Sequence, residues 1–242
     1  PHSFSGAHME EQERHSFLYI PCYTERTSLC WERMIPYGKR FFFKKGETFL
    51  LGTHKEEFGY IKQGLVSCFF KEQTGTKDEI RSFIGPGSLI KETLCACGYG
   101  RFQSKHEAIK DVEIYLFDFD IIYQPSFVAE HNDLMRNFHY SLAAKSMSYQ
   151  FFSSIMKQKT ISQKLAFYVY GHYLFNEQRT SFKPQLTQTL VANLMGVNNL
   201  TINRVVAKWK KDGILACWTK NRMEILDISR IQELRYQEDR SM

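Results

Sequence analysis

The chain has 242 residues, of which 43% are hydrophobic and 24% are charged, with a formal net charge of +6. This length suffices for one large domain or two modest domains with buried cores. No stretch approaches the roughly 20 apolar residues that span a bilayer, and no charged-then-apolar leader opens the sequence. We therefore expect no membrane partner and a cytoplasmic location. Residues 1–8 are interpreted as an expression remnant before Met9.

The six cysteines are irregularly spaced and form no CxxC pair, which predicts neither a disulfide framework nor a metal site. The closest pair is Cys95-x-Cys97. It could act as a redox switch only if exposed and rich in thiolate, and buried or idle thiols are the favoured interpretation.

Residues 40–119 have the pattern of short strands separated by glycine turns. Turn signals every 8–12 residues are typical of an antiparallel sandwich or barrel, and no helix of any length is expected inside it. The expected strands are 40–44, 47–51, 59–61, 65–70, 79–84, 88–90, 106–109 and 113–117.

Residues 131–159 contain neither proline nor glycine and predict a helix about 40 Å long. Its apolar residues alternate at steps of three and four, as in a heptad seam that pairs with a second copy. Lys145 interrupts this seam, and a buried charge predicts a carboxylate or ligand anion nearby. The alternative is an ordinary amphipathic helix that lies on its own domain. The seam residues are Met135, Phe138, Leu142, Tyr149, Phe152 and Met156.

Residues 161–175 predict the next helix after a hinge at 157–160, and two short helical patterns then meet at Gly196. Thr187 is a good N-cap for the first of these. Glycine adopts a positive φ at low cost and so ends it with a sharp turn. Its apolar face is Leu190, Val191, Leu194 and Met195.

The second helix of this pair should begin at Asn198 or Asn199 and present amides and cations outward. Asn pairs with adenine and Arg with guanine in the major groove, whereas Lys neutralises phosphate. The expected inward face is Leu200 or Thr201 with Val205, Val206 and Trp209, and the expected outward face is Asn199, Asn203, Arg204, Lys208 and Lys211.

Two apolar runs, 214–218 and 223–228, follow and flank a basic tip at 219–222, which predicts the wing of a winged helix-turn-helix. Residues 157–222 hold eleven Lys and Arg against only Glu177 and Asp212, as expected of a polyanion binder. A plain helical hairpin with a solvated polar face is the alternative. We predict base contacts from Asn199, Leu200, Asn203 and Arg204, and DNA-backbone contacts from Thr187, Thr189, Asn198, Thr201, Lys208, Lys220 and Arg222.

Glycines and acidic residues of the strand region also carry a family resemblance. Lys45-Gly46-Glu47 followed by Gly52, then Gly64, Gly75 and the run 83–88 with Glu92, resemble the cyclic-nucleotide-binding jelly roll of the CRP/FNR transcription regulators. The resemblance covers nearly all of residues 9–242. It implies an α+β chain with an N-terminal antiparallel β jelly-roll barrel at 9–130, a dimerisation helix at 131–159 and a winged helix-turn-helix at 160–242.

The resemblance further implies a homodimeric regulator that binds double-stranded DNA and a small effector between the barrel and the long helix. RNA polymerase is a candidate partner. The corresponding effector pocket is Lys91, Glu92, Arg101, Gln103, Ser104, Lys105, Lys145 and Tyr149.

This pocket departs from the cyclic-nucleotide pattern of a Gly-Glu pair followed by an Arg-Ser or Arg-Thr pair. Lys91 replaces the glycine, residues 102–103 replace the phosphate-binding pair, and Arg101 is one residue early. Because a cyclic phosphate would lack its bidentate arginine, the sequence disfavours cyclic AMP. Arg101 and the lysines around one carboxylate favour a small organic anion or phenolate of unknown identity.

Other branches of the family differ at the sensor or at the recognition helix. Cys22 and Cys30 do not supply an iron–sulfur cluster, whereas a redox-sensing or haem-sensing regulator, with His106 near the pocket, stays open as an alternative. Leu200 stands where many members carry Glu and suits a thymine methyl. The string GVNNLTINRV is most similar to the branch that regulates reductive dehalogenation in response to halogenated phenols.

Two rival classes are less consistent with the sequence. A cupin-type enzyme needs a His-x-His pair, whereas His54 and His106 stand alone. No motif of a serine hydrolase, a phosphate loop or a zinc protease is present. The second rival is an oligomeric ligand-binding module that does not touch DNA.

Overall fold

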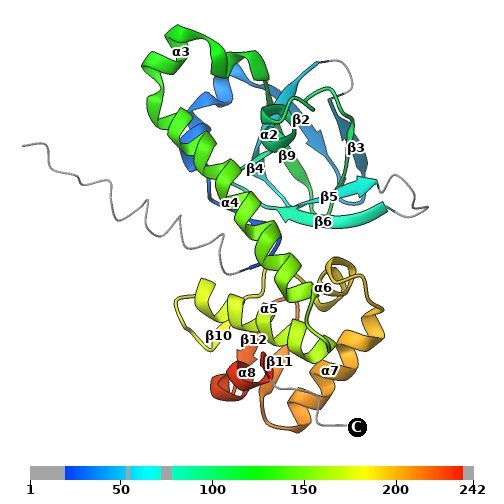
Figure 1. Ribbon diagram of the computed structural model, residues 1–242. Helices are drawn as coiled ribbons and strands as arrows, with labels where there is room; N and C mark the ends of the chain where they lie inside the picture. The colour runs from blue at the N-terminus through cyan, green and yellow to red at the C-terminus, as the bar shows by residue number, and fades with distance from the viewer. Residues whose placement is uncertain (1–19, 53–54, 72–77, 237–242) are drawn as a thin grey trace, which may run out of the picture. The chain divides into compact units, whose positions relative to one another are not determined.

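The computed structural model describes residues 20–52, 55–71 and 78–236 (Figure 1). The expected remnant at 1–8 and the expected turn at Gly75 lie outside these residues. The chain divides into two compact units, Cys22–Met147 and Ser148–Met242. Within the described residues, no helix is long and apolar enough to cross a membrane.

The first unit contains two β-sheets that form a jelly roll. The eight expected strands are confirmed, with ends that differ by at most two residues, and a short strand β1 is added, which pairs in parallel with β6. The five-stranded sheet has the order β1 (Tyr23–Thr24), β6 (Asp78–Ile84), β5 (Val66–Lys71), β8 (Ser104–Ala108) and β3 (Thr48–Leu51). The four-stranded sheet has the order β2 (Lys39–Phe43), β9 (Val112–Asp118), β4 (Glu57–Gln63) and β7 (Ser88–Ile90).

Alternation along the strands builds two cores. In β4, Ile61 points into the core that both sheets share, whereas Phe58 and Tyr60 point to the opposite face. That opposite face is covered by the 3-10 helices η1 (Leu29–Tyr37) and η2 (Phe119–Tyr123) and by the helices α3 (Pro125–Glu130) and α4 (Asn132–Met156). Successive side chains of a strand point to opposite faces, so one strand serves both cores.

A short helix, α2 (Glu92–Ala96), lies between β7 and β8, so the expectation that no helix interrupts the strands is wrong. Five residues are too few to produce a helical periodicity in the sequence. The residue before α2, Lys91, has a φ of 69°, a left-handed conformation that is uncommon for a residue other than glycine.

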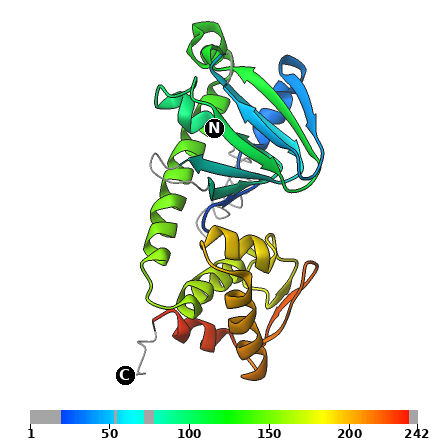
Figure 2. The ribbon, with the colours of Figure 1, turned by 90° about the vertical axis from the view of Figure 1, so that its right-hand side faces the viewer.

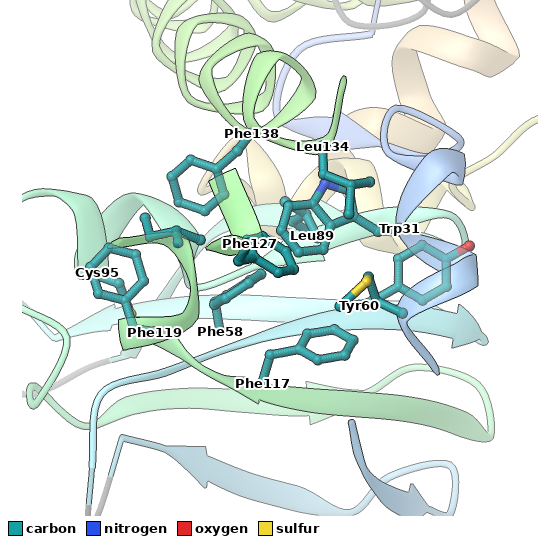
Figure 3. Packing of buried hydrophobic residues seen from close by; sticks show 12 residues of the cluster. Trp31, Phe58, Tyr60, Leu89, Cys95, Phe117, Phe119, Phe127, Leu134 and Phe138 are labelled. Carbon is teal, nitrogen blue, oxygen red and sulfur yellow. The ribbon is translucent and has the colours of Figure 1, made fainter. Parts of the chain in front are cut away.

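The long helix α4 contributes to the second core, which corrects one part of the predicted seam. Phe138 is buried against Trp31 and Phe58, with ring centroids 6.3 and 5.7 Å away (Figure 3). Met135 and Leu142 pack against the same cluster. The 3-4 spacing therefore marks a face that α4 buries in its own unit, as in the alternative interpretation of this helix.

The second unit begins with the end of α4 and continues with α5 (Ile161–Phe175), close to the expected bounds. It then contains α6 (Gln188–Leu194), α7 (Asn199–Lys211) and α8 (Ile228–Leu234). A three-stranded sheet has the order β10 (Ser181–Phe182), β12 (Met223–Ile225) and β11 (Leu215–Trp218). Figure 2 shows the β11–β12 hairpin in orange beside α7.

Candidate nucleic-acid interface and effector site

The turn between α6 and α7 has the local chemistry that the sequence predicted. The Thr187 hydroxyl accepts a hydrogen bond from the Leu190 amide at 3.3 Å and caps α6. Gly196 has a φ of 64°, and the Asn198 side chain accepts from the Leu200 amide at 2.8 Å and caps α7. These caps satisfy backbone groups that each helix end leaves without intrahelical partners.

The buried face of α7 is formed by Ile202, Val206 and Trp209, which corrects the predicted inward face. Leu200 is 60% exposed, and Thr201 and Val205 are half-buried. Ile202 was missed because a 202, 206, 209 stripe and a 201, 205, 209 stripe fit the same helical period. The Trp209 indole N–H also donates to the Ser162 hydroxyl on α5 at 3.3 Å.

The outward face of α7 agrees with the predicted set except at Asn199, whose amide oxygen is buried and has no partner among the described residues. Because these exposed residues recur at steps of three and four, their side chains share one face of the helix. The exposed members of the predicted set are Asn203, Arg204, Lys208 and Lys211, and Leu200, which was predicted to face inward, is exposed beside them.

The wing is a hairpin whose tip is ordered by one hydroxyl group. The Thr219 side chain accepts from the amides of Asn221 and Arg222 at 3.3 and 3.0 Å. Lys220 is exposed, and the exposed Arg222 guanidinium also lies 3.0 Å from Glu224. Sequence reasoning missed β10, which pairs with β12, and the bond from the Gln188 amide to the Trp218 carbonyl at 2.8 Å.

Thr187, Thr189, Asn198 and Thr201 flank this surface at the starts of α6 and α7. Thr189 and Asn198 are exposed, whereas Thr187 and Thr201 are half-buried. Their predicted backbone contacts stay predictions.

In the first unit, a buried ion pair links α2 to α4. The Glu92 carboxylate is fully buried, and its Oε1 atom accepts hydrogen bonds from the Lys145 ammonium and, at 2.7 Å, from the Ser141 hydroxyl. Lys145 also donates to the Leu89 carbonyl at 2.8 Å. The carboxylate expected near Lys145 is therefore Glu92. Ser141 was missed because nothing in its local sequence marks it.

Lys91 is buried beside this pair but has different partners. Its ammonium donates to the Gly100 carbonyl and lies against Gly52, where a β-carbon would collide with it. Burial lowers the pKa of Lys91, and the charges of Glu56 and Glu57 oppose that shift. Gly52 also has a φ of 83°, and a β-carbon there would lie 2.8 Å from the backbone oxygen of Gly100, so its backbone conformation and this close approach explain why position 52 holds glycine.

His106 on β8 is buried and neutral. Burial, followed by the charges of Lys91 and Lys145, lowers its pKa to about 3. One ring nitrogen, Nε2, lies 2.7 Å from the Ser104 hydroxyl, and Nδ1 has no partner among the described residues. His106 thus joins Lys91, Glu92 and Lys145 in one electrostatic cluster.

Of the other predicted pocket residues, Ser104 contacts this cluster through His106, whereas no contact with the cluster is seen for the rest among the described residues. The Arg101 side chain is 85% exposed, and Gln103 is also exposed. The Lys105 ammonium lies 5.4 Å from the centre of the Phe69 ring, and Tyr149 belongs to the second unit. The departure from the cyclic-nucleotide pattern is therefore structural as well as sequential, because Arg101, the nearest candidate for the phosphate-binding arginine, has its side chain exposed to solvent.

The Cys95 thiol donates to the Glu57 carbonyl at 3.3 Å, and burial raises its pKa to about 11. A buried thiol of this pKa is almost entirely protonated near neutral pH, so Cys95 is a poor nucleophile. Cys97 is exposed. Within the described ranges, no group of three or more His, Cys, Asp or Glu residues is placed to hold a metal ion.

The second unit is a winged helix-turn-helix domain, and the jelly roll with its long helix precedes it in the chain. Residues 163–234 match the model of the Crp-like helix-turn-helix domain. No match was found among curated proteins.

Several solved structures have a similar fold. A CooA mutant from Carboxydothermus hydrogenoformans is 15% identical, with a TM-score of 0.68 over 84% of this chain and 90% of that chain. A variant of CprK complexed with OCPA is 15% identical, with a TM-score of 0.69 over 88% and 97%. The c-di-GMP responsive regulator CLP from Xanthomonas campestris is 15% identical, with a TM-score of 0.59 over 81% and 97%. The C-terminal domain is therefore similar to the Crp-like helix-turn-helix domain, and the chain has the fold of the CRP/FNR transcription regulators, as its sequence predicted.

Proposed function

We propose that this chain is a homodimeric, sequence-specific DNA-binding transcription regulator controlled by a small effector at the Glu92–Lys145 cluster. The observation that carries the proposal is the exposed face of α7 in a domain of the Crp-like type. On that face Asn203 and Arg204 stand next to Leu200, and lysines continue it toward the end of the helix. An amide, a guanidinium and an apolar contact are the groups that distinguish bases in the major groove.

The test compares one base-reading residue with one phosphate-binding residue. Arg204→Ala should cost about 1–3 kcal/mol on a selected duplex and relax the preference at one guanine per half-site. Lys208→Ala should weaken selected and random duplexes alike and reduce the slope of log K against log salt by about one unit. Fluorescence anisotropy with both duplexes over a salt series measures these effects.

The control for this test is Lys62→Ala, which removes a surface cation from the first unit. It should leave the affinity for both duplexes unchanged. Equal weakening of selected and random duplexes by Arg204→Ala would show that Arg204 binds phosphate and that α7 has been assigned the wrong role.

A second copy of the chain is proposed to pack on a stripe of α4 that is exposed except at the half-buried Tyr140. Positions 136, 140, 143, 147, 150 and 154 follow the alternating steps of four and three that a helix pair requires. Ala143 is exposed, and Met147 retains 52% of its surface. This stripe is proposed in place of the first part of the predicted seam, because Phe138 is buried in its own unit. The seam contacts of Tyr149, Phe152 and Met156 stay predictions.

The effector is proposed to act at Glu92 and Lys145 because these residues join α2 to the long helix. A ligand that contacts both elements favours one arrangement of them, which shifts the population of DNA-binding states. Solved structures of this fold include one complexed with OCPA and one described as c-di-GMP responsive, so effectors of different chemistry suit the same scaffold. A thermal-shift screen of aromatic acids, phenolates and cyclic nucleotides tests the proposal, and stabilisation by cyclic AMP alone would contradict the assignment of this pocket.

A further inference from the structure

The stability of the fold does not require a buried ion pair at Glu92 and Lys145. Glu92 is fully buried and Lys145 retains 6% of its surface. A buried ion pair loses the hydration of both charges, and a well-packed apolar pair often serves a fold equally well. The pair is also incompletely satisfied, because the Glu92 Oε2 atom has no partner among the described residues.

Glu92 is not needed as the counter-ion of its neighbour Lys91. The Lys91 ammonium donates to the Gly100 carbonyl, and the carboxylates whose charges act on it are Glu56 and Glu57, on the side of β4. Lys145 and Ser141, both on α4, are the side chains bonded to the Glu92 carboxylate. Among the described residues, the Glu92 carboxylate is therefore bonded only to side chains of α4.

The two partners of the ion pair differ in how firmly the fold holds them. Lys145 lies on a helix of 25 residues and keeps a second bond, to the Leu89 carbonyl. Glu92 is the first residue of a helix of five residues and follows Lys91 in the left-handed conformation. Such strained residues commonly occur at switch regions. Glu92 is therefore the partner that can move, and Lys145 is the fixed receptor.

The geometry points to Glu92 as an internal substitute for the effector: a small organic monoanion, with a carboxylate or phenolate group, takes its place on Lys145 and Ser141 and releases α2 from α4. This inference rests on the proposed effector site and adds the ligand class and the switch. The oxygen of the incoming anion accepts the same hydrogen bonds from Lys145 and Ser141 that the Glu92 Oε1 atom accepts without effector. A neutral isostere of the anion cannot replace the negative charge that Glu92 places beside the Lys145 ammonium.

If Glu92 competes with the effector, then removal of its charge must strengthen effector binding. We would measure the dissociation constants of benzoate and 4-nitrophenolate for the full chain by calorimetry at constant ionic strength. Their neutral isosteres, benzamide and 4-nitroanisole, serve as ligand controls. Glu92→Gln should bind at least one of the anions at least tenfold more tightly than the unsubstituted protein, and neither neutral compound should bind to any form.

Lys145→Met should lose anion binding, and Lys62→Met is its matched control, because Lys62 forms an ion pair with Glu32 at the surface of the same unit. Since Lys145→Met leaves Glu92 buried without its cation, the double variant Glu92→Gln/Lys145→Met provides a neutral pair that leaves no unpaired charge buried, and its folding is checked by circular dichroism. The double variant should bind neither anion, whereas Lys62→Met should bind like the unsubstituted protein.

Three results would overturn the inference. These are anion affinity in Glu92→Gln equal to or weaker than that of the unsubstituted protein, anion binding by the double variant, and failure of both anions to bind the unsubstituted protein and Glu92→Gln. Binding of benzoate alone assigns the ligand to the carboxylates, and binding of 4-nitrophenolate alone assigns it to the phenolates. DNA binding in the Arg204 experiment is measured without these compounds, so its outcome separates failure of this switch from failure of the proposed function.

Discussion

His172 is a buried titratable residue of the second unit that takes no part in the proposed interface. Its Nε2 atom lies 2.7 Å from the Tyr168 hydroxyl, and its ring stacks on Phe182. Tyr168 in turn stacks on Trp218 of the wing strand β11. Burial lowers the pKa of His172 to about 3. The folded domain therefore requires the neutral imidazole.

This pKa shift predicts the pH dependence of the second unit. The unfolded chain binds a proton at His172 below about pH 6.5, and the folded chain does not until about pH 3, so stability is complete above about pH 6.5 and is lost as the pH falls. Between about pH 7 and pH 5.5 the expected loss is about 1 kcal/mol from this residue. Urea unfolding of a Trp31→Phe variant, followed by the fluorescence of Trp209 and Trp218, measures it.

His172→Gln in the same background should have a shallower dependence over that range, whatever its stability near neutral pH. His106→Gln is the matched control, because His106 is also buried and neutral but belongs to the first unit. An unchanged pH dependence in His172→Gln would show that His172 is not the proton acceptor.

At the scale of single residues, the sequence predicted which buried group needs a counter-charge, but it did not predict all of that group's hydrogen-bond partners. Lys145 was recognised as a charge that requires an anion, and Glu92 was placed in the same pocket. Ser141 and the Leu89 carbonyl could not be found, because a serine on a helix and a backbone oxygen have no distinguishing pattern. Arg101 was included through its position relative to a family motif, but its side chain is 85% exposed and lies 3.9 Å from Glu56 instead.

At the scale of elements, Gly196 is required by its backbone conformation and not by crowding. It has a φ of 64°, and among the described residues no atom beyond its own chain neighbours lies within 4 Å of a β-carbon built on it. Gly196→Ala should therefore destabilise the second unit by about 1 kcal/mol, the cost of the left-handed conformation for a residue with a β-carbon. Gly196→Asn should cost less, since asparagine tolerates this conformation.

Urea unfolding followed by Trp209 and Trp218 fluorescence measures both Gly196 variants. A loss of several kcal/mol in Gly196→Ala would contradict the open space around this glycine and would indicate a close contact at the turn.

The ends of elements with a clear hydrophobic period, or with turn residues at both ends, were predicted within a few residues, as α4, α5 and the eight strands show. Those that depend on a distant partner were not. The strand β10 has two residues and exists because β12 offers it a free edge, and α2 is a single short helix after a strained residue. The period of α4 was correct, whereas the assignment of its apolar face to a second copy was wrong at Phe138. Periodicity identifies a buried face but not what buries it.

At the scale of the whole molecule, the symmetry of a dimer determines the form of the DNA site. A two-fold pair presents two copies of α7 in opposite directions, so its target is an inverted repeat with half-site centres about one helical turn, or roughly 34 Å, apart. The proposed dimer stripe predicts that Met147→Glu, which introduces like charges at an exposed position of α4, produces a monomer. Tyr123→Glu is a matched control, because Tyr123 is also exposed but lies in η2, away from that stripe.

The spacing of the half-sites then provides the last test. Insertion of about 5 base pairs between the half-sites rotates one of them by half a turn, so the dimer should lose the contribution of one α7 and bind at close to the affinity of a single half-site. Insertion of a whole turn, about 10 base pairs, restores the facing direction but stretches the separation, so the recovery measures how far the two domains can part. The Met147→Glu monomer should be insensitive to both insertions, because it never binds two half-sites at once. Affinities of the unsubstituted protein that do not change with the insertions would contradict the two-fold arrangement even if every single-site contact of α7 were correct.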